Sequence, residues 1–451
     1  MVRLSHLLAL AAAFGLAACG AQQGVAPEQL PMRTAGVETQ LNRSAGKYIK
    51  HVVIIIQENR SFNHLFAGFP GADTQSYGYM HNRQKVALQS IPFEQKTMDH
   101  YYSTGLMDYD NGKMDGFDLN GTSAGMTIGP IAYSYLDRSE AAPYWAMAKH
   151  YVLADHMFPS MFGPSFTAHL TLIAGTADLT PELSEADVPT SSPWGCDAAP
   201  GTTTSTVNTS RTVTGGGPFP CFDQFRTMAD TLDAANLSWK YYAPAIGKDS
   251  GDIFSSFDSI KRIRYGPEWK HNISSPPTKV LADAAAGKLP AVSWVVPDYL
   301  WSDHPSAGTP YGPSWVTAVV NAIGSSPDWK STAIVVVWDD WGGWFDPVPP
   351  PQVDFRGLGI RVGCLIISPY VRPHVSHTTY EFGSILKFVE QTYGLPALGN
   401  ASDGYTDARA TSILDSFDFT QKPRKFHAIP AQYPPSFFTG HAASLHAPDD
   451  V

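Results

Sequence analysis

Side chains that can bind a metal ion follow a strongly apolar segment near the start of the chain. Residues 52–56 are five consecutive β-branched residues, typical of a strand buried on both faces, and Glu58 and Asn59 come soon after them. Ligands bind at the carboxyl ends of strands in an open α/β sheet, and a carboxylate beside an amide offers two oxygens to a hard divalent cation. The alternative is that Asn59 or Ser61 only caps the next helix, while Glu58 favours its N-terminus.

A carboxylate pair, Asp339 and Asp340, follows the second strongly apolar segment, residues 332–338. Two adjacent carboxylates at the end of a buried strand repel each other unless a cation or a proton lies between them. A metal ion is the simplest explanation of this pair. Gly342 and Gly343 then let the backbone approach the site closely.

Ser165 is the candidate nucleophile. It follows Gly163 and Pro164, which break regular structure, and it precedes residues 167–174, which we expect to be helical. A hydroxyl at a helix N-terminus is well placed to attack phosphorus, because the exposed N–H groups favour the incoming anion. The alternative role for this serine is to cap the helix.

Two histidines are candidates for acid–base catalysis. His304 lies in a turn after the short apolar segment 292–296, where it could hydrogen-bond a phosphate oxygen or protonate a leaving group. His100 lies in the loop-rich region 68–129, and the alternative is that it is a surface histidine.

These segments resemble, in the same order, the motifs of the bacterial phosphoesterase family. The family contains phospholipases C and related acid phosphatases, and it belongs to the alkaline-phosphatase superfamily. Residues 54–68 resemble its signature ENRSFDHYFG, with Asn63 in place of Asp. Residues 339–351 match the pattern D-E/D-x-GG-x-x-D-x-V-x-PP, with Trp341 where many members have His. The resemblance runs from about residue 50 to about residue 430.

The segment around the candidate nucleophile departs further from the family. Residues 163–169 match the pattern GP[S/T]xPNR/H at Ser165, but Thr167 and Ala168 replace Pro and Asn. Asp303 stands where the family often has a second histidine. That departure weakens the assignment of the leaving-group acid.

The resemblance implies a cofactor and a mechanism. It implies one divalent metal ion, with Ca²⁺, Mg²⁺ or Mn²⁺ expected for oxygen ligands, held by Glu58, Asn59, Asp339, Asp340 and Ser165. It also implies hydrolysis in two displacements. Ser165 attacks phosphorus, His304 or His100 assists the departing alcohol, and water cleaves the phosphoseryl intermediate.

The expected activity is hydrolysis of phosphoric esters, of the acid-phosphatase type. We expect the chain to lack the extra C-terminal domains of the longer phospholipases C, and this expectation places a phospholipase C cleaving phosphatidylcholine-type diesters second. A third possibility is a non-catalytic surface lipoprotein that binds metal or phosphate, motivated by Asp303 and Trp341 at expected histidine positions. A sulfatase would carry a Cys/Ser-x-Pro-x-Arg motif, which the sequence lacks.

The expected substrate contacts are a phosphoryl group and, for a phospholipid, its head group. Asn59 and His304 are the predicted phosphoryl contacts. Trp301 and Trp341, with Trp344 nearby, could form an aromatic cage around choline. The alternative for these tryptophans is packing within the protein.

The first nineteen residues predict a targeting signal. Arg3 precedes the apolar residues 7–16, and the Leu-Ala-Ala-Cys sequence ending at Cys19 resembles a bacterial lipoprotein signal, in which Cys19 is lipidated. Gly20 rather than Asp then implies the outer membrane, with residues 20–46 as a polar tether. We therefore expect an exported protein, an outer-membrane lipoprotein or a periplasmic protein of a Gram-negative bacterium, held to the membrane by lipid. The alternative is an ordinary secretory signal with an incidental Cys.

Net charge and cysteine content bear on the partners of the protein and on the compartment in which it folds. The formal net charge of −10 argues against a nucleic-acid partner. Cys196 and Cys221 flank a Ser/Thr/Gly-rich segment and could close a disulfide around it in an oxidising compartment. Cys364, in an apolar run, is expected to be a buried free thiol.

The alternation of apolar strands with helices predicts an α/β fold with a predominantly parallel sheet covered on both faces. By resemblance this is the alkaline-phosphatase-like three-layer α/β/α sandwich with a mostly parallel central sheet. We expect residues 47–430 to form the catalytic domain, residues 431–451 a tail, and the insert at about 184–220 a surface loop or lid.

Overall fold

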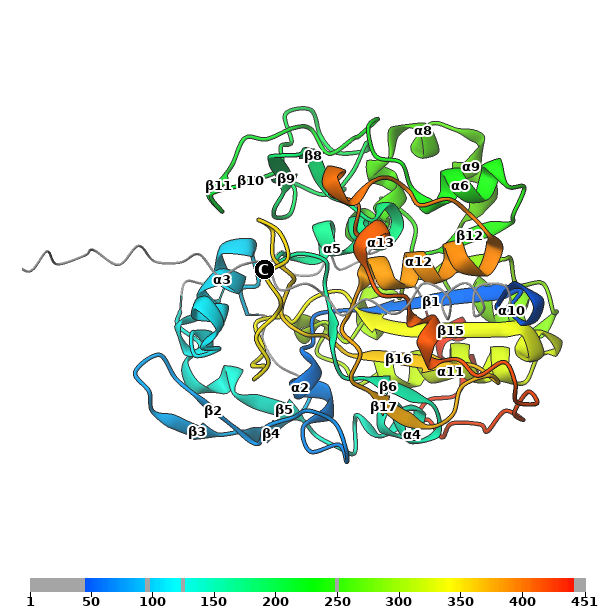
Figure 1. Cartoon of the computed structure of the whole chain (residues 1–451), viewed down its shortest axis with the longest axis horizontal. Helices are drawn as coiled ribbons and strands as arrows, with labels where there is room; N and C mark the ends of the chain where they lie inside the picture. The colour runs from blue at the N-terminus through cyan, green and yellow to red at the C-terminus, as the bar shows by residue number, and fades with distance from the viewer. Residues whose placement is uncertain (1–44, 94–97, 123–125, 248–250, 442–451) are drawn as a thin grey trace, which may run out of the picture.

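The computed structural model describes residues 45–441, except residues 94–97, 123–125 and 248–250 (Figure 1). The predicted signal peptide, Cys19 and nearly all of the predicted tether lie outside the described residues. An eight-stranded sheet lies at the centre of the described chain. Its strands, in spatial order, are β13 (Ile273–Ser274), β12 (Trp239–Tyr242), β14 (Val292–Val295), β1 (His51–Gln57), β15 (Thr332–Trp338), β16 (Cys364–Ile367), β6 (Val152–Ala154) and β17 (His374–Ser376).

The centre of the sheet is the parallel pair β1 and β15. The β-branched side chains of both strands are fully buried, as expected for strands covered on both faces. The register places Ile54 opposite Val335 and Gln57 opposite Trp338. Because both strands end at this register, the residues that follow them emerge side by side at one edge of the sheet.

The remaining pairings make the sheet mostly parallel. Of its strands, only β16 runs antiparallel to its neighbours, β15 and β6. Figure 1 shows helices on both faces: α5 (Ser165–Ala174) and α12 (Phe382–Tyr393) cover one, while α4 (Ala142–His150) and α11 (Gly312–Gly324) cover the other. The predicted three-layer α/β/α fold is confirmed.

The shorter elements surround this sandwich. The other helices are α2 (Phe62–Phe66), α3 (Tyr102–Tyr109), α6 (Met228–Ala234), α7 (Gly251–Phe254), α8 (Lys261–Arg264), α9 (Pro267–Asn272), α10 (Lys279–Ala285), α13 (Thr406–Arg409) and α14 (Pro435–Gly440). Small sheets contain β2 (Tyr77–Tyr79), β3 (Lys85–Ala87), β4 (Gln89–Ile91), β5 (Ser134–Leu136), β7 (Met157–Phe158) and β18 (Tyr380–Glu381). None of the described helices is both long and apolar enough to span a bilayer.

The helix α5 begins at Ser165, two residues before the segment that we expected to be helical. Gly163 has φ +138°, and a Cβ at this position would lie 2.8 Å from the Ala186 carbonyl oxygen and 2.7 Å from Thr167 Oγ1. Only glycine adopts this backbone readily. The sharp turn before the helix therefore sets where its first residue lies.

The Ser/Thr/Gly-rich insert, together with the residues just before it, forms strands that its composition did not predict. The strands β8 (Asp178–Thr180), β9 (Leu183–Glu185), β10 (Thr206–Asn208) and β11 (Val213–Thr214) form an antiparallel sheet. Thr and Val are β-branched, so they favour extended chain even in a segment rich in turn residues. A disulfide joins Cys196 and Cys221, with their Cα atoms 4.5 Å apart, and Cys364 is a buried free thiol.

Part of the expected C-terminal tail packs on the sandwich. Phe438 in α14 contacts the rings of Trp301 and Trp315, with centroids 5.1 and 5.5 Å away. Burial of the Phe438 ring stabilises α14, a helix that is too short to be stable alone. Phe438, the one buried residue among the described residues beyond 430, therefore anchors this segment on the core.

The half-buried carboxylate of Asp354 gives an acid-sensitive contribution to stability. Burial would raise its pKa, but Arg356 and Arg409 hold the pKa at about 2, below the ordinary 3.8. The resulting stabilisation is complete above the pKa that Asp354 has in the unfolded chain. It is lost as the pH falls through the lower pKa that Asp354 has in the folded protein. Asp354→Asn should lower the free energy of unfolding by about 2 kcal/mol at pH 7. Urea titrations should show this difference shrinking from about pH 4 toward pH 2; a difference independent of pH would contradict it.

Candidate active site

The carboxyl ends of β1 and β15 bring four of the predicted metal ligands together. The Asn59 N–H donates to Asp339 Oδ1 (2.8 Å), and the Asp340 N–H donates to the same oxygen (2.7 Å). The side chains of Glu58, Asn59, Asp339 and Asp340 are fully buried. The two strand ends therefore form one buried cluster rich in oxygen atoms.

A close approach of two loops holds this cluster. Asn59 adopts the left-handed conformation, with φ 55°. A Cβ at Gly342 would lie 2.2 Å from the Asn59 carbonyl oxygen, and the Gly342 N–H donates to Asp340 Oδ1 (2.7 Å). A glycine is therefore required where the chain after Asp340 passes the chain after Glu58.

Ser165 reaches the cluster from the N-terminus of α5. Its hydroxyl donates to Glu58 Oε2 (3.1 Å) and lies 3.5 Å from Asp340 Oδ2. The exposed fraction of the serine is 5%, so a group that enters the site meets this hydroxyl in a largely dry environment. The first N–H groups of α5 lie at the same point and favour an anion.

His169 is a site residue that the sequence analysis did not assign. Its Nε2 lies 2.9 Å from Glu58 Oε1 and 3.7 Å from Asp339 Oδ2. Glu58, His169 and Asp339 each offer a ligand atom, all within 4.8 Å of one another. The signal was available, because His169 lies four residues after Ser165 and so faces the same side of a helix.

His100 orients the amide of Asn59. Its Nδ1 lies 2.8 Å from the Met98 carbonyl oxygen, so Nδ1 carries the proton and Nε2 accepts from the Asn59 side-chain amide (2.8 Å). The amide oxygen of Asn59 is left buried without a hydrogen-bond partner, and so is Asp339 Oδ2. Orphaned buried oxygens of this kind fit a metal ion.

His304 has the opposite tautomer. The Ser306 N–H donates to its Nδ1 (3.3 Å), so the neutral ring carries its proton on Nε2. The ring centroid lies 6.5 Å from that of His100. Burial lowers the pKa of both histidines, and this favours their neutral forms.

The electrostatics of the cluster also fit a bound cation. Burial raises the pKa of Glu58 to about 7. Burial, followed by repulsion from the neighbouring carboxylates, raises the pKa of Asp339 to about 8 and also raises that of Asp340. Three carboxylates so close together are costly unless protons or a metal ion neutralise them. A divalent ion could therefore be held by the residues of this cluster, which are Glu58, Asn59, Asp339, Asp340, Ser165 and His169.

The tryptophans proposed for substrate binding are packed inside the protein. Trp301 packs against the rings of Trp315 and Phe438, and Trp341 donates from its indole N–H to Asp108 Oδ2 (2.9 Å). Trp344 stacks on His64, with centroids 4.0 Å apart. The exposed fractions of the three are 3%, 0% and 1%, so their faces are not available as a choline cage in this conformation.

Asp303 does not take the place of a second active-site histidine. Its Oδ2 accepts from the Tyr144 hydroxyl (2.6 Å) and the Trp338 indole N–H (3.1 Å), and the residue has φ 71°. The Asp303 carbonyl oxygen accepts from Arg60 (2.9 Å). The carboxylate thus supports the turn that carries His304.

Replacing His169 should weaken metal binding. His169→Gln removes a ligand atom, or the partner that orients Glu58, and should lower the affinity for Mn²⁺ by about 10–100-fold in a calorimetric titration. His377→Gln, which changes a solvent-facing histidine bound to Asp155, is the matched control and should bind Mn²⁺ as the parent does. Equal affinities for all three proteins would remove His169 from the site.

Known proteins are similar to this chain over most of its length. The model of a family described as the Phosphoesterase family matches residues 49–396. Phospholipase C A of Mycobacterium tuberculosis is 25% identical over 434 residues, covering 83% of this chain and 78% of its own. The hemolytic phospholipase C of Pseudomonas aeruginosa is 25% identical over 439 residues, which cover 82% of this chain and 56% of the relative. A solved structure from Vibrio parahaemolyticus, a protein in the alkaline phosphatase superfamily, aligns over 80% of this chain and 76% of its own. The identity is 11% and the TM-score is 0.36.

Proposed function

Because the chain belongs to the phosphoesterase family and is a phosphoester hydrolase, we propose that it cleaves phosphodiesters of the phospholipid class by attack of Ser165 on phosphorus. The observation that carries this proposal is the position of the Ser165 hydroxyl. It lies at the start of a buried helix and donates to Glu58 within the carboxylate cluster. A serine that only capped the helix would direct its hydroxyl at a backbone N–H of its own first turn.

The chain's own residues provide the steps of the reaction. When bound, a divalent ion would stabilise charge on the phosphoryl oxygens and lower the pKa of the serine hydroxyl. The Ser165 oxygen attacks phosphorus while its proton passes to Glu58 Oε2, and the bond to the leaving alcohol breaks. His304 donates a hydrogen bond from its Nε2 to the departing oxygen, which leaves as the alcohol by taking a proton from water, and the proton on Glu58 neutralises the hydroxide that remains; the proton of His100 is held by the Met98 carbonyl. Water then cleaves the phosphoseryl ester and regenerates the serine.

The charges around the nucleophile favour a diester over a monoester. Within the described part of the chain, no Lys or Arg forms an ion pair with Glu58, Asp339 or Asp340. A monoester dianion would need more cationic donors than neutral histidines, an amide and one metal ion supply. This argument, with the names of the relatives, places a phospholipase C ahead of the acid-phosphatase activity that we first expected.

A comparison of two chromogenic substrates tests the proposal. Metal-replete protein should hydrolyse p-nitrophenyl phosphorylcholine faster than p-nitrophenyl phosphate, and chelation should abolish both activities. A chelation-sensitive preference for the monoester would instead support an acid phosphatase. Failure to hydrolyse either ester, with metal bound, would favour a protein that only binds metal or phosphate.

Export with a lipid anchor forms part of the same proposal. The positive start, apolar segment and Cys19 of the N-terminus support it, and the disulfide between Cys196 and Cys221 suits an oxidising compartment. The anchored protein would present residues 47–430 as its catalytic domain, near a membrane that contains its substrate.

A further inference from the structure

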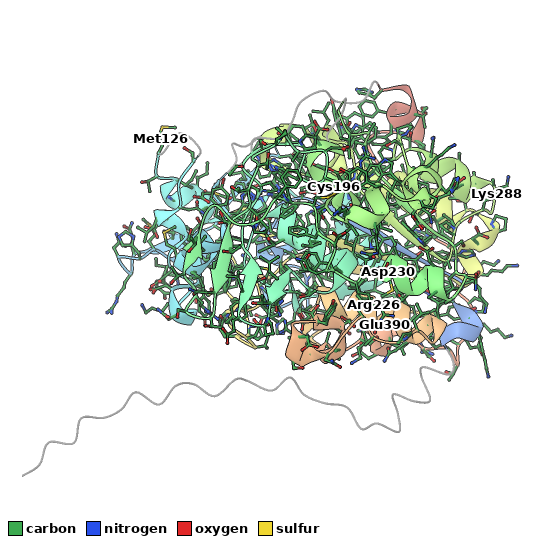
Figure 2. The ribbon with its side chains drawn as sticks, turned by 90° about the horizontal axis from the view of Figure 1, so that it is seen from above. Met126, Cys196, Arg226, Asp230, Lys288 and Glu390 are labelled. Carbon is green, nitrogen blue, oxygen red and sulfur yellow. A yellow bond between two sulfur atoms is a disulfide. The ribbon has the colours of Figure 1, made fainter. Side chains whose placement is uncertain are left out.

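Exposed apolar side chains are concentrated in one segment of the described chain. The described chain exposes seven large hydrophobic residues, and four of them lie between residues 77 and 136. These four, which we call the apolar rim, are Tyr79, Leu119, Met126 and Ile131, with exposed fractions of 47%, 43%, 55% and 40%. Figure 2 shows Met126 at the periphery of the molecule. Such a concentration of exposed apolar side chains indicates an interaction surface.

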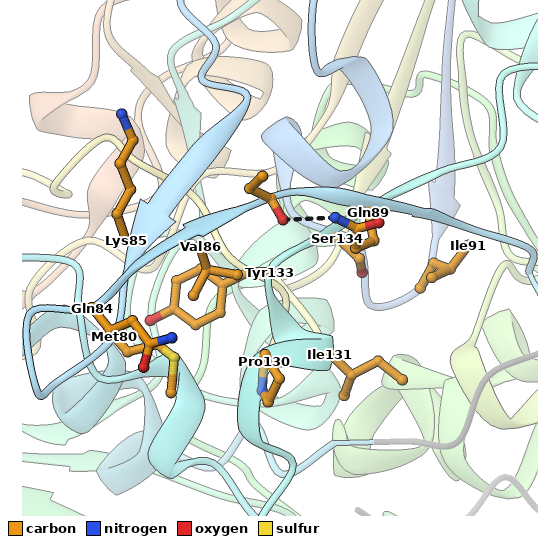
Figure 3. A pocket seen from close by; sticks show the side chains of 11 residues that line it. Met80, Gln84, Lys85, Val86, Gln89, Ile91, Pro130, Ile131, Tyr133 and Ser134 are labelled. Carbon is orange, nitrogen blue, oxygen red and sulfur yellow. Dashed lines mark hydrogen bonds between the residues drawn. The ribbon is translucent and has the colours of Figure 1, made fainter.

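A groove of about 600 Å³ adjoins the apolar rim. Its apolar lining includes Val86 in β3, Ile91 in β4 and Pro130 and Ile131 in a short helical turn (Figure 3). Ile131 belongs to both the rim and the groove. The exposed apolar surface therefore continues into a depression that can accept part of an apolar ligand.

Two unpaired cations lie on the hairpin beside the groove. Arg83 and Lys85 are exposed, and neither forms an ion pair with any carboxylate of the described residues. Lys85 lies over the Tyr77 ring, 3.6 Å from its centroid. The protein as a whole carries a net charge of −10, so these cations stand out beside an apolar surface. Apolar side chains next to cations complement an anionic lipid surface.

The region that bears the rim packs directly on the active-site loops. The Asp99 N–H, next to His100, donates to the Gly121 carbonyl oxygen (3.0 Å) in the hairpin that leads to Met126. Phe117 and Tyr133 contact the ring of Phe345, with centroids 5.3 and 4.9 Å away. Phe345 belongs to the same loop as Asp339 and Asp340. The rim is therefore joined to the site that would act on a lipid head group.

We propose that the apolar rim and its groove dock on the surface of an anionic phospholipid bilayer. The inference rests on the proposed function, because it assigns the bilayer as the form in which the diester substrate is met. The rim enters the boundary between head groups and acyl chains, the groove receives apolar parts of the lipid, and Arg83 and Lys85 contact anionic head groups.

Vesicle partitioning and hydrolysis test the docking surface. The triple variant Leu119→Ser, Met126→Ser, Ile131→Ser is compared with its parent, and all proteins carry Cys19→Ser so that an acyl group at this position contributes to none. The triple variant should bind vesicles of phosphatidylcholine and phosphatidylglycerol at least about tenfold more weakly. Its hydrolysis of the vesicle lipid should fall to a similar extent. Its turnover of soluble p-nitrophenyl phosphorylcholine should stay within about twofold, since none of the three residues contacts the site.

Matched variants separate the contribution of this surface to vesicle binding from the general effects of substituting exposed residues. Tyr265→Ser changes a residue with an exposed fraction of 64% in another region, and it should leave vesicle binding unchanged. Arg83→Gln with Lys85→Gln should weaken binding by about tenfold on vesicles that contain phosphatidylglycerol, and much less on phosphatidylcholine alone.

Two failures are distinguishable in these experiments. Vesicle binding and lipid hydrolysis by the triple variant at the level of its parent would overturn the docking surface and leave the rim to a protein partner. A parent that cannot hydrolyse the soluble diester would instead overturn the proposed function. Partitioning needs no catalysis, so it decides the docking surface in either case.

Discussion

Replacing Ser165 with Ala should lower the turnover of a phosphodiester by at least about 10⁴-fold, because the variant lacks the atom that attacks phosphorus. The buried carboxylates and His169 remain, so Mn²⁺ should stay bound. Steady-state kinetics and metal analysis on the same preparation check both statements. In the parent, rapid acid quenching during turnover should trap a phosphate group on the peptide that contains Ser165.

Two further variants test whether the loss of turnover is specific to the hydroxyl of Ser165. Ser160→Ala changes a serine that is also buried, whose hydroxyl has no partner, and its turnover should stay close to that of the parent. Ser165→Thr retains a hydroxyl and should recover part of the activity. Full activity of Ser165→Ala would show that another group attacks phosphorus, whatever the metal content of the protein.

The second large effect concerns stability and arises from a fully buried ion pair. The Arg361 Nε donates to Asp346 Oδ1 (2.9 Å), and both side chains are inaccessible to solvent. Arg361 also donates to the Asp155 carbonyl oxygen (2.7 Å), and its guanidinium lies 4.6 Å from the centroid of the Phe62 ring. Arg361→Met would leave Asp346 buried and uncompensated, which should cost about 3–5 kcal/mol of unfolding free energy.

Urea denaturation of matched variants checks this expectation. Arg372→Met removes the exposed partner of Asp418 and should cost less than about 1 kcal/mol. Adding Asp346→Asn to Arg361→Met should recover part of the lost stability, since the unpaired charge is removed. Equal losses for the exposed and the buried pair would contradict the role assigned to burial.

The central strands and the layers were predictable because their signals are local. Residues 332–338 form β15 over the whole of the predicted apolar segment, since a long apolar run leaves few alternatives. The antiparallel direction of β16 was not predictable. It depends on how the long chain between Trp338 and Cys364 returns to the sheet, and no short pattern encodes that path.

The side chains of the site were predictable only where they adjoin such strands. Glu58 and Asp339 follow buried runs, so the sheet register determines their meeting. His169 was missed because a histidine within an apolar helix resembles an ordinary buried residue. The placement of Trp301 was equally hidden, since its partner Phe438 lies far along the chain and their contact depends on tertiary packing.

The hydrogen bond between Asn59 and Asp339 joins residues 280 positions apart in the chain. During synthesis the ribosome completes Glu58 and Asn59 long before Asp339 exists, so an emerging chain carries only half of the ligand set. Any metal ion that these residues hold is therefore acquired by a finished and folded chain. The ions available in the compartment where folding ends then decide which metal the protein receives.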